Sequence, residues 1–214
     1  MNKIKLLLIA IGFIFSLNLY AQNDFKIGIN VGINYPKVRG HEYAKYNNFK
    51  VGYLFGVSID YYLKENLSLK TNINYERKIK KLQLTYFSYT SEEIGTENFS
   101  EIYEYINIPI LLKYEFGNST FFVNGGPFFN YLLNNKIEPD FPNEDSDSYT
   151  EQKKIDFGFS LGIGTNISLN EKNDITIEIR DDLGIIDTGY VPKSVKGTVK
   201  TNAVKFILGW NLGI

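Results

Sequence analysis

The feature that most constrains this chain is a strict two-residue alternation that returns along its length. In residues 25–35, FKIGINVGINY, one set of alternate positions is wholly apolar, and the other consists of Lys, Gly and Asn. Successive side chains of a β-strand point to opposite faces, so this stretch predicts a strand with one apolar and one small, polar face. What lies against the apolar face decides what kind of protein this is.

Seven later segments repeat the alternation, and a chain of 214 residues suits one all-β domain. In residues 155–169, for example, Phe157, Phe159 and Leu161 alternate with Gly158 and Ser160. The expected strands cover residues 25–35, 51–63, 67–80, 102–116, 120–133, 155–169, 174–186 and 201–214.

The connections between these strands alternate between short and long. The short ones are 64–66, 117–119 and 170–173, and the long ones are 36–49, 81–101, 134–153 and 187–200. In an antiparallel up-and-down barrel, odd and even connections fall at opposite ends. Outer-membrane barrels have short periplasmic turns, long external loops and both termini in the periplasm. The spacing therefore predicts an eight-stranded antiparallel up-and-down transmembrane β-barrel.

The composition of the polar face distinguishes two kinds of barrel. A secreted, soluble lipocalin-like barrel that binds a small ligand is the alternative, and it would turn its apolar face inward and a Lys- and Glu-rich face to water. Here the second face is mostly Gly, Asn and Ser, which suits the crowded lumen of a small barrel. We therefore expect the apolar face to contact lipid, with aromatic residues near both interfaces.

The N-terminal segment predicts export. Lys3 and Lys5 precede an apolar run from Ile4 to Phe15, and Ala21 precedes the expected cleavage site. This is the pattern of a secretory signal peptide at residues 1–21, followed by the barrel domain at 22–214. An uncleaved membrane helix is the alternative, although the apolar run is short of the roughly 20 residues that a spanning helix needs. The absence of cysteine fits an envelope protein.

Four segments resemble a known family. They are INIPILLKYEF at 106–116, VNGGPFFNYLL at 123–133, DFGFSLGIGTNI at 156–167 and IEIRDDLGI at 177–185. They are similar to motifs of the Bacteroidota outer-membrane β-barrel family that includes the PorT-like proteins. The resemblance implies an eight-stranded outer-membrane barrel, and by analogy with some relatives it implies a role accessory to type IX protein secretion. The expected partners are outer-membrane lipid and other envelope or secretion proteins, contacted through the loops.

Alternation turns a set of charged side chains into the lumen. They are Lys26, Asp60, Lys70, Glu76, Lys113, Glu115, Asp156, Glu178, Arg180, Asp182 and Lys205. Five are basic and six acidic, so we expect them to pair and to plug the bore rather than to line an ion-selective transport pore. Arg180 is the expected hub, because its five donors can engage several carboxylates. Asp181 faces lipid in this scheme, so we expect it at the outer interface or at a β-bulge.

No motif indicates an enzyme, a cofactor or a metal. His41 is the only histidine, and no serine and carboxylate accompany it in a catalytic pattern. The acidic stretch 138–151 could bind calcium, although it lacks the spacing of an EF-hand, and a solvated external loop is the simpler interpretation. A net charge of −1 gives no reason to expect a nucleic-acid partner. We therefore expect a structural or interaction role carried by the loops.

Overall fold

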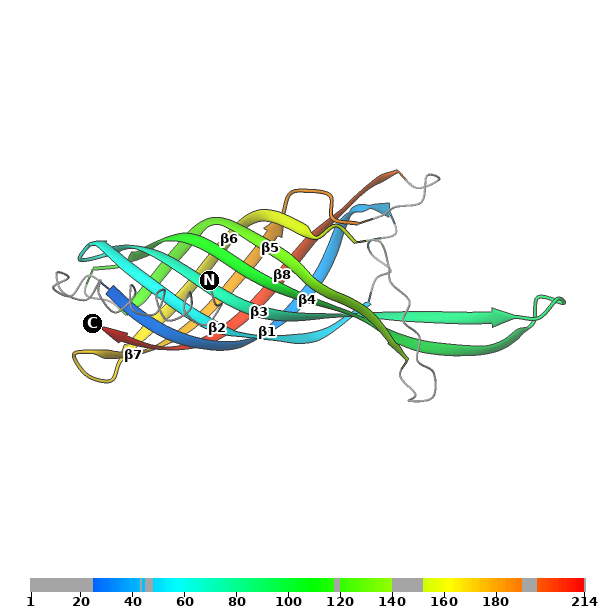
Figure 1. Ribbon diagram of the computed structural model, residues 1–214, viewed down its shortest axis with the longest axis horizontal. Helices are drawn as coiled ribbons and strands as arrows, with labels where there is room; N and C mark the ends of the chain where they lie inside the picture. Colours follow the sequence, from blue (N-terminus) through cyan, green and yellow to red (C-terminus); the bar gives the residue numbers. More distant parts are fainter. Residues whose placement is uncertain are drawn as a thin grey trace, which may run out of the picture.

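The computed structural model describes residues 25–42, 44, 48–117, 120–139, 152–189 and 196–213. Its strands are β1 (Phe25–His41), β2 (Asn48–Lys64), β3 (Leu67–Phe87), β4 (Glu93–Glu115), β5 (Phe121–Pro139), β6 (Ile155–Ser168), β7 (Asn173–Gly184) and β8 (Gly197–Gly213). Each strand pairs with the next in antiparallel fashion, and β8 pairs with β1 to close an eight-stranded barrel (Figure 1). The predicted fold class is confirmed.

The barrel wall turns its apolar face outward. In β1, Ile29 and Val31 are 57% and 56% exposed, whereas Asn30 and Asn34 are 4% and 1% exposed. The same alternation holds in β2 and β6, and outward-facing rings such as Trp210 are also exposed. The soluble lipocalin-like alternative is wrong, because it required the apolar face inside.

Glycines on the inner face allow neighbouring strands to approach closely. A Cβ atom added to Gly56 would lie 2.2 Å from the backbone oxygen of Ile73 and 2.5 Å from Oδ1 of Asn74. Since real Cβ atoms do not approach that closely, the inner face at this position has room only for glycine. This explains why the polar face of the sequence is rich in glycine.

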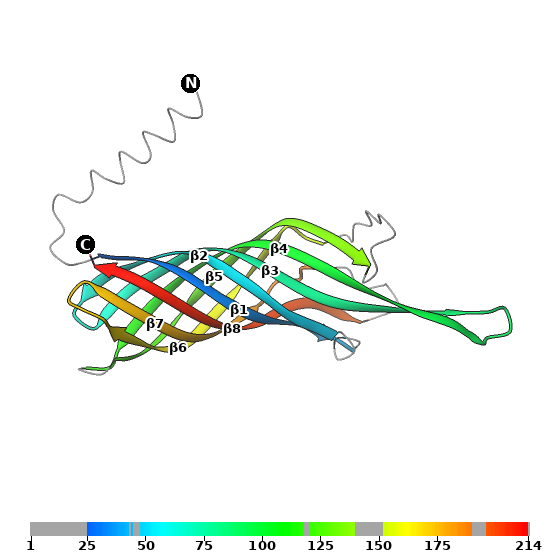
Figure 2. The same cartoon turned by 90° about the horizontal axis from the view of Figure 1, so that it is seen from below.

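Strands β3 and β4 are much longer than the sequence predicts. The expected loop at 81–101 is wrong, because the two strands stay paired from Lys81 and Ser100 outward to Phe87 and Glu93, and only residues 88–92 connect them. Figures 1 and 2 show this pair extending far beyond the other strands. On β4 both faces of the extension are exposed at most positions and residues 93–98 do not alternate, whereas on β3 Leu82, Leu84 and Tyr86 alternate with Gln83 and Thr85, a strand signal that the prediction overlooked.

Other boundaries differ by a few residues. Strand β1 continues to His41 and β5 to Pro139, whereas β7 ends at Gly184. The short connections 65–66, 116–120 and 169–172 share one end of the barrel with Phe25 and Gly213, and we call it the short-turn end. The opposite end, from which β3 and β4 extend, is the hairpin end. Among the described residues, no helix is long and apolar enough to span a membrane. The predicted signal peptide at 1–21 lies outside the described residues.

Candidate functional site: the polar lumen

The structure places the predicted lumen residues on the inner face of the wall. Nine of them are at most 3% exposed, and they are Asp60, Lys70, Glu76, Lys113, Asp156, Glu178, Arg180, Asp182 and Lys205. Lys26 and Glu115 are half-buried at the short-turn end. A buried charge is costly unless it is paired and hydrogen-bonded, so the partners of each group decide whether this lumen is stable.

Lys113 organises the charges near the short-turn end. Its Nζ atom lies 3.0 Å from Oδ2 of Asp60 and 2.8 Å from Oε1 of Glu115, and it sits 4.7 Å from the ring centroid of Phe122. Lys26 forms an ion pair with Asp174 at the same end. One cation thus bridges two carboxylates from β2 and β4, while the Phe122 ring adds a cation–π contact.

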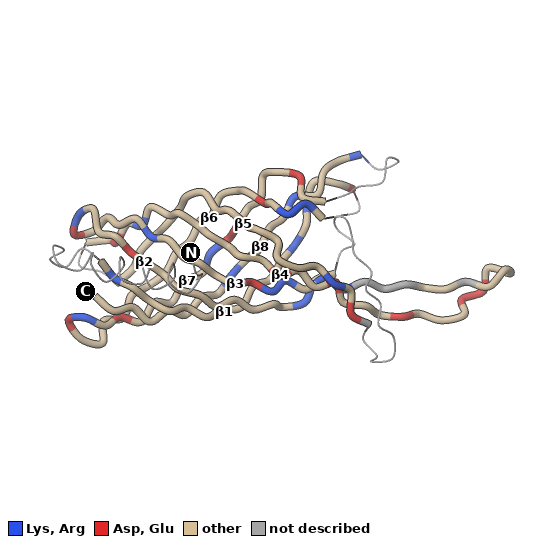
Figure 3. Tube along the Cα trace, viewed as in Figure 1, with Lys and Arg blue, Asp and Glu red and all other residues tan. Residues whose placement is uncertain are grey.

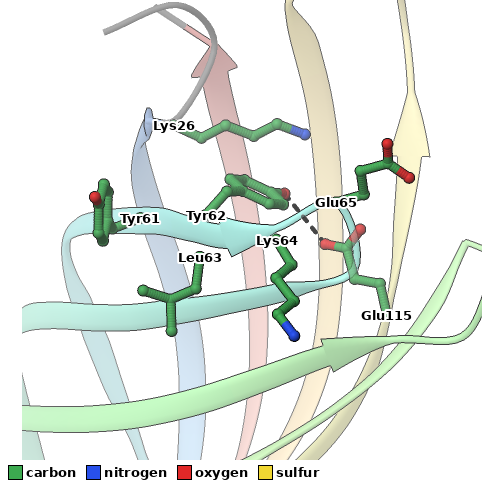
Figure 4. Close-up of a pocket in the computed structure, with 7 residues that line it drawn as sticks. All are labelled: Lys26, Tyr61, Tyr62, Leu63, Lys64, Glu65 and Glu115. Carbon is green, nitrogen blue, oxygen red and sulfur yellow. Dashed lines mark hydrogen bonds between the residues drawn. The ribbon is translucent and has the colours of Figure 1, made fainter.

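A pocket opens at the short-turn mouth beside this cluster (Figure 4). Its lining residues are Lys26, Tyr61, Tyr62, Leu63, Lys64, Glu65 and Glu115. The Tyr62 hydroxyl donates a hydrogen bond of 3.2 Å to Oε1 of Glu115, and the Asn166 amide donates to the same oxygen at 3.0 Å. Acidic and basic groups line the pocket together, and Lys26 and Glu115 are already engaged, so it offers no surface of one charge to an ionic ligand.

Glu178 is the centre of the middle cluster. It accepts hydrogen bonds from Nε of Arg180 at 2.7 Å and from Nδ2 of Asn124 at 2.9 Å, and Nζ of Lys70 lies 3.3 Å from its other oxygen. Arg180 also donates from both terminal nitrogens to Oδ1 of Asn72, each at 3.4 Å. Three donors converge on one fully buried carboxylate.

Lys205 has the role that the sequence assigned to Arg180. It forms ion pairs with Glu76 and Asp182, whereas Arg180 forms an ion pair with Glu178 alone among the described residues. Arg180 and Lys205 are register partners on β7 and β8, so the two cations lie side by side and divide the available carboxylates. The expectation that Arg180 would be the hub is therefore wrong.

Further groups complete the cluster around Lys205. The Ser160 hydroxyl donates to Oδ1 of Asp182 at 2.6 Å, and Nζ of Lys78 lies 3.4 Å from Oε2 of Glu76. Towards the hairpin end, Lys80 lies 3.4 Å from Oε2 of Glu101. Lys78 and Glu101 are buried in the lumen, and the sequence analysis missed both.

A chain of asparagines crosses the lumen and was also missed. Asn30 donates to Asn74 at 2.6 Å, Asn74 to Asn107 at 3.4 Å, Asn107 to Asn130 at 2.7 Å, and Asn130 to Asp156 at 3.1 Å. These residues lie on β1, β3, β4, β5 and β6. Because an amide both donates and accepts, it can pass a hydrogen bond from strand to strand. Asparagine recurs on the polar face of the predicted strands, and this pattern could have predicted the chain of asparagines. The sequence analysis considered only the charged residues of that face.

Large apolar side chains occupy the lumen together with these polar groups. Leu54, Leu111, Phe122 and Phe128 are at most 2% exposed. Within the described residues, no three His, Cys, Asp or Glu side chains gather as a metal site would need. In the acidic stretch 138–151, Glu138 pairs with Lys136 and Arg77, and residues 140–151, on which the choice between a solvated loop and a calcium site depends, lie outside the described residues. The arrangement is that of a packed, internally neutralised core.

The chain is similar to several solved outer-membrane proteins at low sequence identity. No curated protein matches the chain. Among solved structures, OprG from Pseudomonas aeruginosa is 12% identical, with a TM-score of 0.47, 90% of this chain covered and 96% of OprG covered. Neisserial surface protein A is 14% identical, with a TM-score of 0.45 and coverages of 89% and 97%. Ail of Yersinia pestis is 9% identical, with a TM-score of 0.45 and coverages of 89% and 99%.

The family comparison carries the assignment. A model described as the outer membrane protein beta-barrel domain matches residues 20–189, which is most of the chain. Closure of the barrel leaves no unpaired sheet edge in the wall, as a β-protein in hydrocarbon requires. The chain belongs to the outer membrane protein β-barrel domain family, resides in the outer membrane and meets lipid with its apolar outer face.

Proposed function

We propose that this protein is a non-enzymatic, plugged outer-membrane barrel that presents the extension of β3 and β4 to partners outside the cell. The observation that carries this proposal is the extension itself, residues 82–98, which we call the projecting hairpin. It is the part of the described molecule that reaches farthest from the barrel wall (Figure 2).

The edges of the projecting hairpin are open. The last pair between β2 and β3 is Asn48 with Lys81, and the last pair between β4 and β5 is Phe99 with Pro139. Beyond these pairs no other described strand borders residues 82–87 or 93–98. Unpaired strand edges are a template for a further strand, and proteins generally shorten, cover or charge them. A long open ribbon of this kind supports a role in recognition.

The side chains of the projecting hairpin also differ from those of the wall. It carries three carboxylates, Glu92, Glu93 and Glu97, and no Lys or Arg. Tyr86 and Ile94 are 46% and 70% exposed. Exposed aromatic and aliphatic groups beside uncompensated carboxylates favour a partner with a basic, partly apolar surface.

The plugged lumen supports the structural half of the proposal. Basic and acidic groups pair at close range from Lys26 at one end to Lys80 at the other. A channel that selects ions would line its wall with one sign of charge. We therefore assign the lumen network to stability, with Lys205 and Lys113 as its main cations.

Orientation and lineage complete the proposal. Short turns and both barrel termini belong in the periplasm in this class, which puts the projecting hairpin outside the cell. Removal of residues 1–21 as a signal peptide precedes this insertion. The motifs at 106–116 and 156–167 support a PorT-like, Bacteroidota lineage, in which the hairpin would serve as an accessory contact for protein secretion.

Site-specific crosslinking on intact cells tests the proposal. A photo-crosslinking residue at Asn98 should capture an envelope or secreted protein, whereas the same group at Lys172, in a short turn, should not give that product. An impermeant thiol reagent should likewise label Asn98→Cys and not Lys172→Cys. Labelling of Lys172→Cys alone would invert the orientation, and identical crosslinks from both sites would contradict a role specific to the hairpin.

A further inference from the structure

Three basic side chains lie together on the outer surface at the hairpin end of β1 and β8. Arg39 and Lys200 are direct register partners. Lys37 pairs with Asn202, which is the next outward-facing pair towards the short-turn end. All three continue the outward positions of Tyr35 and Val204. Lys37 and Arg39 are exposed, and Lys200 is half-buried. We call Lys37, Arg39 and Lys200 the basic triad.

The triad places like charges against each other. Residues directly opposite on an antiparallel pair have Cβ atoms about 4.5–5.5 Å apart, and like charges there are destabilising. Within the described residues, none of the three forms an ion pair with a carboxylate. Lys37 instead sits 5.5 Å from the ring centroid of Tyr35, and Arg39 donates to the backbone oxygen of Gly184 at 2.5 Å.

The acidic groups near the triad are engaged elsewhere. Asp181 accepts a hydrogen bond of 2.6 Å from Asn202, and Asp187 accepts from the Val199 N–H at 2.8 Å and from Lys153 at 3.1 Å. Glu42 lies beyond the irregularity in pairing between Arg39 and His41. None of these acidic groups forms an ion pair with the triad, so its three charges have no direct carboxylate partner within the described residues.

Other basic residues at the same end show the contrast. Arg77 and Lys136 both pair with Glu138, Lys80 pairs with Glu101, and Lys153 pairs with Asp187. Lys and Arg are numerous at this end of the barrel, whereas Asp and Glu are the charges of the projecting hairpin (Figure 3). The triad differs from these four residues in that it lacks carboxylate partners within the described structure.

The position of the triad indicates what compensates it. On the same face, towards the short-turn end, lie Tyr35, Val204 and Phe206, each about two-fifths exposed at 43%, 43% and 41%. The triad thus stands where the lipid-facing surface ends, at the level of lipid headgroups. A guanidinium binds phosphate through two parallel hydrogen bonds, and ammonium groups add charge attraction.

We propose that Lys37, Arg39 and Lys200 bind the phosphate-bearing headgroup of an outer-leaflet lipid, whose acyl chains lie against Tyr35, Val204 and Phe206. The choice of leaflet rests on the orientation in the proposed function. A phospholipid or glycolipid has both parts that this surface can bind, an anionic headgroup for the basic triad and acyl chains for the apolar residues next to it. It also removes the like-charge repulsion between Arg39 and Lys200.

Lipid retention tests this site. The folded full-length barrel is incubated in zwitterionic detergent micelles with a diphosphorylated glycolipid or with its dephosphorylated form, and the lipid that copurifies is measured. We expect the wild-type protein to retain the phosphorylated form. The triple variant Lys37→Gln/Arg39→Gln/Lys200→Gln should bind about a hundredfold more weakly, taking about fivefold for each basic residue near an anionic surface. The matched control, Lys136→Gln/Lys153→Gln, removes two carboxylate-paired cations at the same end and should bind as wild type.

Further variants and competitors in the same lipid-retention experiment separate the possible outcomes. If the triple variant does not fold, Lys200→Gln alone should weaken retention about fivefold. Inorganic phosphate at equal concentration should not displace the lipid, and displacement would show a site for free anions instead. Equal retention by the wild-type and triple variants, or equal retention of the dephosphorylated lipid, would overturn the site. Crosslinking from Asn98 is independent of this result, so failure here leaves the hairpin proposal standing.

Discussion

Strands β3 and β4 stay paired with each other through two environments, and only in the wall are they flanked by β2 and β5. Within the wall, Glu76 and Glu101 are buried, and each has a lysine within ion-pair distance. In the projecting hairpin, Glu93 and Glu97 are exposed and accept hydrogen bonds from the hydroxyls of Thr96 and Tyr86. The ladder between β3 and β4 continues through both regions, and the carboxylates that have lysine partners are the buried ones, so burial is what demands a compensating charge.

The largest expected effect comes from removing the cation that contacts two buried carboxylates. Lys205→Ala leaves Glu76 and Asp182 without that partner, and loss of one member of a buried pair costs about 3–5 kcal/mol. The temperature at which the detergent-solubilised barrel loses its compact gel mobility should fall clearly. Glu97→Ala, in the projecting hairpin, is the matched control and should change stability by less than about 0.5 kcal/mol.

Arg180→Ala should also lower that temperature, but by less than Lys205→Ala. Glu178 would keep Lys70 at 3.3 Å and the Asn124 amide at 2.9 Å. Outer-membrane targeting should be intact in both variants. A Lys205→Ala barrel that melts like the parent would show that the plugged lumen does not stabilise the fold.

A pair of glycine substitutions sharpens the comparison. A Cβ at Gly56 meets the backbone of β3 at 2.2 Å, whereas a Cβ at Gly95 meets nothing within 4 Å. Gly56→Ala should therefore destabilise the barrel by about 1–3 kcal/mol, the range for overpacking, and Gly95→Ala should be nearly neutral. Melting of both variants by gel mobility checks this, and equal effects would contradict the close approach at Gly56.

The same comparison explains what the sequence could predict. In the wall, lipid and lumen impose opposite chemistries on successive residues, so the strands from Phe25 and Ile155 are evident from alternation alone. In the projecting hairpin the β4 residues are exposed on both faces at most positions, so Gly95 and Thr96 obey no such rule, and the short alternation from Leu82 to Tyr86 on β3 did not outweigh the loop prediction. A propensity argument, based on the β-branched and aromatic residues around Tyr86, was the remaining signal.

The candidate site shows the same limit at the level of side chains. Alternation places Arg180 and Lys205 on the inner face, but it does not say which carboxylate each will reach. That choice depends on the stagger between strands, which pairs Arg180 with Lys205 and brings Asp182 to the latter. The chain from Asn30 to Asp156 likewise depends on contacts across the lumen, and these follow from closure and not from any local pattern.

A smaller effect is expected at Asp181, the outward carboxylate of β7. It pairs regularly with Leu161 and Val204, so the predicted β-bulge is absent, and it lies three residues before the end of β7 at Gly184. Charged residues cost about 0–1 kcal/mol near the interfaces, with acidic ones at the low end. Asp181→Leu should therefore raise stability in lipid vesicles by less than about 1 kcal/mol, and a gain of several times that would place Asp181 near the bilayer centre.

The smallest expected effect concerns Asp187, a half-exposed carboxylate in the connection between β7 and β8. Burial raises its pKa and is the largest single influence, but the Val199 N–H and the Lys153 ammonium together outweigh it, so its pKa is lowered from the ordinary aspartate value. A lowered folded-state pKa means that the contact stabilises the connection fully above the unfolded pKa of about 3.9 and is lost as pH falls through the folded value. Protection of the Val199 amide against hydrogen exchange, corrected for intrinsic rates, should therefore fall only in strongly acidic solution.

In Lys153→Gln the loss of this protection should begin at higher pH, because the ammonium that lowers the pKa of Asp187 is gone. An unchanged profile would show that this surface pair, unlike the pairs of the lumen, contributes nothing to the order of the connection.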